Sequence, residues 1–306
     1  MIAVVGSINE DLVLEVPRFP RPGETIQGRT FARYAGGKGA NQAVAAARLG
    51  SDVALFGAVG DDESGRRLLN GLRAEGIDVR DLMTVEDVPT GVATIWVDER
   101  GENAIAAAPG ANACTDPGFI DRVLKRLAAS DVLLLQFEIP IDTVARLLER
   151  LPATRPIVIV NPAPARPLGD LPIRFERIDI FTPNMAEMAT LAGAADREQG
   201  ACRLLERGIG NVVCTAGANG AFWYRRGEAS VHAPAPDVEA MDTTAAGDAF
   251  NGALASALES NAIGEAIRWG VAAGAIATTR RGAQPSLPMR NEVETLLRQI
   301  ATSNAR

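Results

Sequence analysis

Short runs of apolar, often β-branched residues alternate along most of this chain with longer stretches of 3.6-residue periodicity. This pattern constrains the fold more than any other feature, because it is typical of strands joined by crossover helices into a parallel sheet. Strands are predicted at residues 2–5, 52–56, 132–136, 156–160, 178–182 and 211–215. Helices are predicted at residues 39–49, 63–75, 117–128, 141–151, 185–192 and 197–207, and the chain beyond residue 247 is predicted to be mostly helical.

Two segments interrupt this alternation. Residues 12–34 place prolines and glycines between short alternating runs, and residues 91–108 are predicted to form a hairpin that turns at residues 98–102. We expect both segments to build an antiparallel lid over one end of the main sheet, whereas the alternative is a pair of hairpins without a function. Because no internal repeat or low-complexity linker is present, one domain is predicted over residues 1–306, with lid segments at about residues 10–35 and 90–110.

The charge balance limits the partners of the chain. Its 38 acidic and 31 basic residues give a net charge of -7, which is the wrong sign for attraction to nucleic acid or to anionic membranes. Aromatic residues make up 5% of the sequence, so platforms that stack the bases of single-stranded nucleic acid are not expected. A local phosphate site remains compatible with this composition.

The cysteines and the apolar runs bear on the cellular compartment. Cys114, Cys202 and Cys214 lie far apart without a CxxC pair, so we expect reduced, buried thiols rather than disulfides or a zinc site. The N-terminus lacks the basic region and the long apolar run of a secretory signal. The most apolar later stretch, residues 132–141, is too short to span a bilayer. A cytoplasmic location is therefore predicted.

The run from Asp242 to Gly252 is the most informative stretch for chemistry. Small residues lead there to Asp248, at the start of an amphipathic helix. Backbone amides at such a helix N-terminus favour an anion, for example a phosphoryl group in transfer. A carboxylate beside them can accept the proton of an attacking hydroxyl. The alternative is that Asp248 only caps its helix.

Polar residues also follow the first and third predicted strands. Asn9 and Asp11 come after residues 2–5, and Glu138 comes after residues 132–136, where ligands of open α/β sheets bind. Such side chains can pair with vicinal hydroxyls. The cluster at residues 35–43, with Lys38 and Asn41, matches neither the P-loop nor the dinucleotide pattern, but it could hold a hydroxyl-rich ligand.

Two further segments at strand ends could contact a nucleotide. Asn184 and Glu187 are three residues apart, so on a starting helix they share a face and could hold a hydrated magnesium ion. The alternative for this pair is helix capping. Residues 215–220 follow another strand and supply a glycine turn on which a nucleotide could lie.

Taken together, five motifs resemble the ribokinase family of sugar kinases. They are residues 36–43 (GGKGANQA), residues 161–166 (NPAPAR), Asn184 with Glu187, residues 242–248, and residues 282–286 (GAQPS). The likeness runs over about residues 4–289 with the motifs in the family's order. It implies an α/β fold, a three-layer α/β/α sandwich with a mostly parallel central sheet and a small β-sheet lid. It also implies transfer of the γ-phosphoryl group of ATP to the primary O5 hydroxyl of D-ribose.

The resemblance implies a role for each matching residue. Asp248 is the expected catalytic base, and the amides of Ala245, Ala246 and Gly247 are the expected anion hole. The expected sugar-binding residues are Asn9, Asp11, Gly37, Lys38, Gly39, Ala40, Asn41 and Glu138, together with Asp248. The expected nucleotide-binding residues are Asn184, Thr215, Ala216, Gly217, Ala218, Asn219 and Gly220, together with Gly247 and Asp248.

The family also uses two cations. Glu187 matches the acid associated with Mg²⁺, which it is expected to hold through water. A monovalent cation, usually K⁺, is expected to bind mainly to carbonyl groups at Asp242, Thr244, Ala277, Arg280, Gly282 and Ser286. One departure is Ala245, where many relatives have glycine. Because the lid strands have open edges, we also expect a homodimer that pairs through them.

Other functions are compatible with parts of this pattern. A kinase of the same family could act on another sugar or on a nucleoside, although nucleosides usually need more aromatic stacking than this sequence offers. A sugar sensor without catalysis would have no use for Asp248 beside an anion hole. A nicotinamide-dependent dehydrogenase is disfavoured, because the glycine fingerprint is missing after the first strand.

Overall fold

The centre of the molecule is an eight-stranded sheet. The computed structural model describes residues 1–194 and 196–304, and its strand order is β14-β13-β12-β11-β10-β9-β1-β4. The strands from β4 to β12 run parallel, while β13 and β14 are antiparallel to their neighbours. Their bounds are β1 (Ile2–Val5), β4 (Val53–Phe56), β9 (Val132–Gln136), β10 (Ile157–Asn161), β11 (Ile180–Phe181), β12 (Asn211–Thr215), β13 (Ala221–Tyr224) and β14 (Val231–Ala233).

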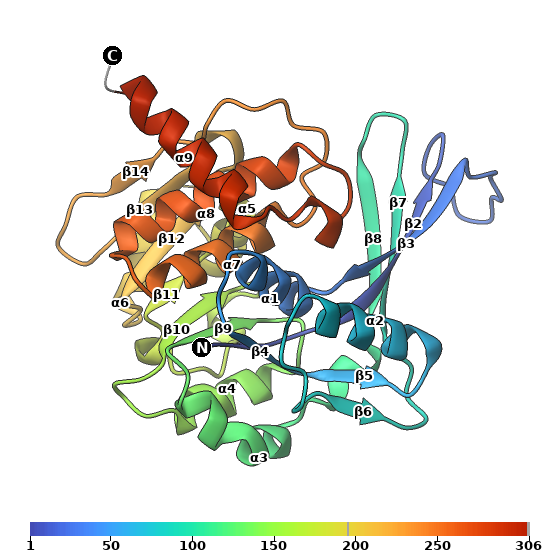
Figure 1. Cartoon of the computed structure of the whole chain (residues 1–306), viewed down its shortest axis with the longest axis horizontal. Coiled ribbons are helices and arrows are strands. Elements are labelled where there is room, and N and C mark those ends of the chain that lie inside the picture. Colours follow the sequence, from blue (N-terminus) through green and yellow to red (C-terminus); the bar gives the residue numbers. More distant parts are fainter. Residues whose placement is uncertain (195, 305–306) are drawn as a thin grey trace.

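Helices cover both faces of this sheet, because its buried strands carry apolar side chains on both sides. Ile2 and Val4 pack with α1 (Lys38–Arg48), α2 (Glu63–Ala74), α7 (Ala246–Leu258), α8 (Ile263–Thr278) and α9 (Arg290–Asn304). Ala3 and Val5 face α3 (Pro117–Ala128), α4 (Ile141–Arg150), α5 (Met185–Ala192) and α6 (Arg197–Glu206). The predicted three-layer α/β/α sandwich is confirmed (Figure 1).

The second sheet is small and has the order β3-β2-β7-β8. It consists of β2 (Asn9–Glu15), β3 (Thr30–Gly36), β7 (Gly91–Val97) and β8 (Asn103–Ala108), and it projects from one side of the main body (Figure 1). The predicted hairpin is present, and in its turn Asp98 accepts the N–H groups of Arg100 and Glu102 at 2.8 and 3.1 Å. The prediction of an all-antiparallel sheet is wrong in one pair, since β2 and β7 run parallel. The chain between them crosses the main body and re-enters from the same end.

The sequence does not predict the shortest elements of the structure. β5 (Ala58–Gly60) and β6 (Met83–Val85) form a two-stranded parallel sheet, and β13 extends the main sheet. Three or four residues are too few to show a period. The remaining turns of helix are 3₁₀ elements, namely η1 (Gly110–Cys114), η2 (Leu168–Asp170), η3 (Phe175–Arg177), η4 (Gly217–Asn219) and η5 (Gln284–Ser286).

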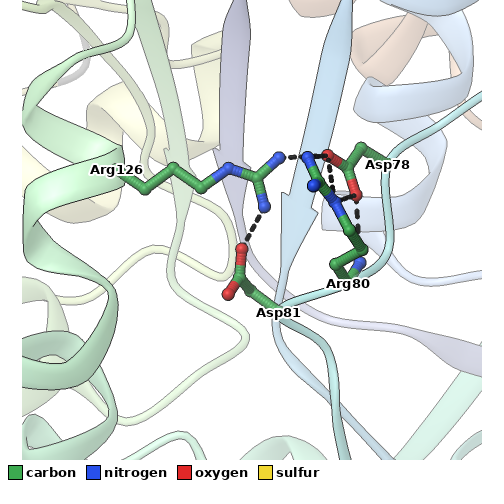
Figure 2. A network of polar contacts seen from close by, with 4 residues as sticks. All are labelled: Asp78, Arg80, Asp81 and Arg126. Atoms are coloured by element: carbon green, nitrogen blue, oxygen red, sulfur yellow. Dashed lines mark hydrogen bonds and ion pairs between the residues drawn. The ribbon is translucent and has the colours of Figure 1, made fainter.

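An ion-pair network fastens the β4 edge of the main sheet. Arg126, from α3, binds both Asp78 and Asp81, while Arg80 pairs with Asp78 at 2.6 Å (Figure 2). These hydrogen bonds hold the pKa of Asp78 well below its usual range. The backbone of Asp78 also bonds to Val53 and Leu55, so the loop continues the sheet beyond β4.

Two expectations about the cysteines and the membrane can be compared with the structure. All three cysteines are free, but only Cys214 is buried; Cys114 is half-buried and Cys202 is exposed. The expectation of buried thiols is therefore wrong for Cys202, because its position on α6 faces solvent. In residues 1–194 and 196–304, no helix combines the length and the apolar character needed to cross a bilayer.

Candidate active site

The carboxyl ends of the parallel strands meet at one edge of the main sheet, as predicted. The segment after β1 carries Ser7 and Asn9, β9 is followed by Glu138, and β10 ends at Asn161. The N-terminal ends of α1 and α7, two helices that pack against each other, complete this edge (Figure 1). Residues that are far apart in the sequence thereby surround Asp248.

Asp248 lies in the first turn of α7 and is buried. Its Oδ2 accepts a hydrogen bond from Asn41 Nδ2 at 2.9 Å, and its Oδ1 accepts one from Gln42 Nε2 at 3.0 Å. The carboxylate does not cap its own helix, because no side chain caps α7 among the described residues. Burial raises the pKa of Asp248, against the opposing effects of Lys38, Asn41 and Gln42. Asp248 is therefore not the cap of its helix. It is a buried carboxylate that is held by two side-chain donors.

The N-terminus of α7 is open to a ligand. Ala245 precedes it with φ of 59°, in the left-handed region that alanine rarely adopts. The first amides of a helix lack partners inside the helix, and here they have no side-chain cap, although the Ala246 N–H donates to the Thr243 carbonyl at 3.3 Å. A Cβ added to Gly247 would meet no heavy atom within 4 Å, so space lies in front of this backbone. The predicted anion hole at residues 245–247 fits this geometry.

Charge around Asp248 is strongly unbalanced toward the negative. Burial alone would lower the pKa of the Lys38 ammonium, but the nearby carboxylates of Asp248, Glu138, Glu187 and Asp11 together raise it. Burial, reinforced by Glu138 and Asp248, raises the pKa of Asp11 to about 7. One lysine thus faces four carboxyl groups. Such a site favours ligands that bring hydroxyl donors or accompanying cations.

Asn9 and Glu138 are held by neighbours that fix their orientation. Asn112 binds the backbone N–H and C=O of Ile8, and its Nδ2 donates to Asn9 Oδ1 at 2.7 Å. Asn9 therefore keeps its own amide N–H groups for another partner. Glu138 accepts hydrogen bonds from the Ser7 hydroxyl and, at 3.2 Å, from the backbone N–H of Lys38.

The glycines before and in α1 allow a close approach of backbones. Gly37 has φ of 88°, and a Cβ there would lie 2.7 Å from the backbone nitrogen of Asn9. A Cβ on Gly39 would lie 2.6 Å from the backbone of Gly6. Both Gly39 and Ala40 are buried. This packing brings Lys38 and Asn41 to the end of β1, so these glycines have a structural reason besides any ligand contact.

Six of the predicted nucleotide residues, 215–220, run from the last residue of β12 through η4 (Gly217–Asn219) to Gly220. The backbone of Thr215 bonds to Pro183, which joins this segment to the start of α5. Residues 217–219 form η4, and Gly217 faces open space, since a Cβ there would meet nothing within 4 Å. His232 Nε2 lies 2.7 Å from the carbonyl oxygen of Asn219, so the sole histidine of the sequence supports this turn.

Asn184 and Glu187 form a reciprocal capping box on α5. Asn184 Oδ1 accepts the Glu187 N–H, and Glu187 Oε2 accepts the Asn184 N–H, both at 2.8 Å. The structure thus shows the helix capping that the sequence offers as the alternative for this pair. Burial and the charge of Asp248 raise the pKa of Glu187, while Asn184 and Lys38 oppose this. Within the described part of the chain, no three acidic, histidine or cysteine side chains form a metal cluster. The predicted role of Glu187 toward a hydrated Mg²⁺ stays a prediction.

Three of the six predicted potassium positions, Asp242, Thr244 and Gly282, are joined by hydrogen bonds. The two carboxylate oxygens of Asp242 accept the N–H groups of Thr244 and Gly282, each at 2.9 Å. The N–H groups of Met241 and Asp242 donate to Thr278 O, next to Ala277 at the end of α8. Although burial opposes it, these bonds and Arg281 lower the pKa of Asp242. Arg280 lies after the end of α8 and Ser286 lies in η5, so the binding of a monovalent cation by all six positions stays a prediction.

A cavity of about 570 Å³ lies between the small sheet and these loops. Its lining includes Asp11 and Tyr34 from the small sheet, and Asp242, Thr244 and Gly282 from the loops. This volume is large enough for a small-molecule ligand. The cavity reaches the predicted site from the side of the small sheet.

Several residues of the site were not singled out from the sequence. Gln42 donates a hydrogen bond to Asp248, Asn112 to Asn9 and Ser7 to Glu138, while the buried Gln136 and Asn161 are hydrogen-bonded to Gln42. Asn161 belongs to the NPAPAR motif at residues 161–166, which by itself indicates no role for its side chain. Gln136 could have been noticed, since it is a polar residue that ends an apolar strand. Asn112 gives no such local signal.

Comparison with known proteins agrees with this geometry. The model of the pfkB family of carbohydrate kinases matches residues 1–290. A ribokinase of Haemophilus influenzae is 43% identical over 298 residues, covering 95% of this chain and 96% of that protein. A deoxyribokinase of Salmonella typhimurium is 36% identical over 294 residues, covering 94% and 95%. The structure of an Arabidopsis thaliana ribokinase complexed with ribose and ATP superposes with a TM-score of 0.88 at 31% identity, covering 97% and 98% of the two chains.

Proposed function

The chain belongs to the pfkB family of carbohydrate kinases, and we propose that it is a ribokinase, which transfers the γ-phosphoryl group of ATP to the O5 hydroxyl of D-ribose. The observation that carries this proposal is the buried Asp248 carboxylate, held by Asn41 and Gln42 beside the uncapped N-terminus of α7. A base beside an anion site is what phosphoryl transfer to a hydroxyl requires.

In the proposed reaction, Asp248 accepts the proton of the sugar hydroxyl as the hydroxyl oxygen attacks the γ-phosphorus. The bond from that phosphorus to the β–γ bridging oxygen breaks, and ADP leaves. The amides of Ala245, Ala246 and Gly247 stabilise negative charge on the transferred group. Glu187 would hold Mg²⁺ through water, and that ion supplies charge neutralisation on the phosphates when bound.

The sugar side of the site favours a hydroxyl-rich ligand. Asn9 and Asn41 each have an amide end that no described residue occupies: the buried Asn41 Oδ1 has no hydrogen-bond partner, and Asn9 keeps its N–H groups. Such groups discriminate against a ligand that lacks the matching hydroxyl, because they would stay unpaired. The unpaired amide groups of Asn9 and Asn41 support ribose as the substrate. Deoxyribose, for which one of the relatives is named, lacks one hydroxyl group.

The small sheet is proposed to act as the lid, with residues 1–306 as one domain. It contributes Asp11 to the site and walls the cavity opposite Asp242. Closure over the sugar would exclude water, which would otherwise consume ATP. A monovalent cation, K⁺, is proposed to bind the carbonyl-rich loops around Asp242 and to strengthen the adjacent anion hole.

A homodimer that pairs through the small sheet is also proposed. Its outer strands β3 and β8 have open edges. Phe31, Trp96 and Ile105, all on this sheet, are exposed large apolar side chains. Light scattering at micromolar concentration is expected to give twice the chain mass of 32.2 kDa. A monomer mass would contradict this part of the proposal.

The activity is tested by measuring ADP production from ATP and Mg²⁺ over a panel of pentoses, hexoses and nucleosides, with and without K⁺. We expect the highest kcat/KM on D-ribose, increased by K⁺. A preference for another sugar would keep the kinase chemistry and overturn the assignment of Asn9, Asn41 and Glu138. No turnover on any acceptor would favour a sugar sensor instead.

A further inference from the structure

A chain of buried amide side chains reaches Asp248 from the interior of the main sheet. Gln136, at the end of β9, donates from Nε2 to Gln42 Oε1 at 2.7 Å. Gln42, on α1, donates from Nε2 to Asp248 Oδ1 at 3.0 Å and to Asn161 Oδ1 at 3.2 Å. Gln42 and Gln136 are fully buried, and Asn161 is nearly so.

The direction of these hydrogen bonds is fixed by groups that cannot reverse. The carbonyl of Thr182 can only accept, so Asn161 must turn its Nδ2 toward it, at 3.2 Å. Asn161 then presents its oxygen to Gln42, and Asp248 in its ionised form likewise offers only acceptors. Both neighbours therefore require the Nε2 end of Gln42, and its oxygen is left for Gln136. The orientation of the Gln42 amide thus follows from the whole chain of contacts.

We propose that Gln42 is a positioning residue for Asp248: it holds Oδ1 of the carboxylate by a fixed donor and thereby sets both the direction and the protonation of the catalytic base. This inference rests on the proposed function of Asp248 as base. Asn41 holds the other oxygen, but its own Oδ1 is buried without a hydrogen-bond partner in the described chain. Gln42 differs, because both ends of its amide are paired with side chains of the protein, Nε2 with Asp248 and Asn161 and Oε1 with Gln136.

The charged groups around Asp248 come from four other elements. Lys38 on α1 favours its ionised form, and Glu138 after β9 opposes it. Asp11 on β2 and Glu187 on α5 also interact with it. None of these groups is hydrogen-bonded to Asp248, whereas Gln42 is. Loss of the Gln42 donor should therefore raise the pKa of the base while the surrounding charges stay in place.

The test is the variant Gln42→Met, which keeps the length of the side chain and removes its donor. We expect kcat to fall about tenfold and the KM for the sugar to change by less than about threefold, because Gln42 touches no sugar-binding group other than Asp248. The acidic limb of the kcat profile should move upward by about one pH unit, as expected for loss of a hydrogen bond to a charged group.

Gln136→Met is the matched control. It makes a similar change at an equally buried glutamine, but Gln136 does not contact Asp248, and Asn161 still orients Gln42. Its acidic limb should stay at the parent position. Equal shifts in both variants would show that Gln42 acts only through packing, and an unshifted limb with parent kcat in Gln42→Met would overturn the proposal.

A second variant covers the case in which Gln42→Met does not fold. Gln42→Glu has nearly the same shape, but its carboxylate would face that of Asp248, so the acidic limb should move upward by more than one pH unit. A parent-like profile in this variant would also refute the proposal. The pKa of Asp248 can be followed without turnover by NMR of ¹³C-labelled aspartate, assigned with Asp248→Asn. That measurement shows whether Gln42 lowers the pKa of Asp248 even if the chain phosphorylates no sugar. A failure of the Gln42 proposal can therefore be told apart from a failure of the proposed function.

Discussion

Replacing Asp248 by asparagine removes the proposed base and keeps the shape of the side chain. In the parent protein, both carboxylate oxygens accept hydrogen bonds, from Asn41 and from Gln42. Asparagine offers one acceptor, so its NH₂ group must face one of these two donors. An unpaired buried donor costs about 1–3 kcal/mol. This cost is opposed by the removal of a buried charge, whose unfavourable environment is seen in the raised pKa of Asp248.

The effect on turnover should be much larger than the effect on folding. General-base catalysis typically contributes about 10²–10⁴-fold, so we expect kcat to fall by about 10³-fold. The amides of Ala245, Ala246 and Gly247 remain, and they should preserve the remaining rate through charge stabilisation. Sugar binding should persist, because Asn9, Asp11 and Glu138 are unchanged. The loss is therefore expected in kcat rather than in binding.

The assay compares ADP release with ribose binding by calorimetry in the same preparation. Asp116→Asn is the matched control, because Asp116 caps α3 by accepting the Phe119 N–H at 2.7 Å and asparagine is an equally good cap. This control should keep parent kcat. If Asp248→Asn retained more than a tenth of the parent kcat while binding ribose normally, Asp248 would not be the base.

Three further changes test other parts of the site. Asp11 keeps its proton in the folded state up to about pH 7 but loses it near pH 3.8 when unfolded, so its contribution to stability falls as pH rises between these values. Asp11→Asn should remove that part of the slope, and equal slopes in thermal unfolding between pH 5 and 8 would contradict it. Asn112→Leu leaves the Ile8 N–H and Asn9 Oδ1 without their partner. It should lower the free energy of unfolding by about 3 kcal/mol in urea titrations and raise the KM for the sugar. A variant with the stability and KM of the parent would count against this role of Asn112. Ala245→Gly should keep turnover, because glycine adopts the left-handed conformation freely, whereas Ala245→Val should lower both stability and kcat; equal behaviour of the two variants would dismiss the strain argument.

Most of the main sheet and its helices could be predicted, because each depends on a local period. Residues 132–136 and 211–215 are strands with the predicted bounds, and residues 117–128 and 185–192 are helices with the predicted bounds. The strand predicted at residues 178–182 is reduced to Ile180–Phe181. The strands of the two-stranded sheet were missed, since their stability comes from pairing and not from a pattern of their own.

The sequence by itself determined which residues are the candidates for the proposed chemistry, because the members of each motif lie close along the chain. Lys38 and Asn41 lie together at the start of one helix, and the small residues before Asp248 lead directly into another. Their types already indicate an anion beside a carboxylate and a ligand rich in hydroxyls.

Only the tertiary structure decided how these groups are oriented. Gln42 meets Asp248 across 206 positions of the sequence and Gln136 across 94, and Asn112 meets Asn9 across 103. Such contacts depend on how α1 and α7 pack on the sheet and on where the small sheet crosses its edge, and no local period encodes them. The physical reason is that a buried polar group must find its partner wherever packing brings one, so its hydrogen bonds are settled by the whole fold.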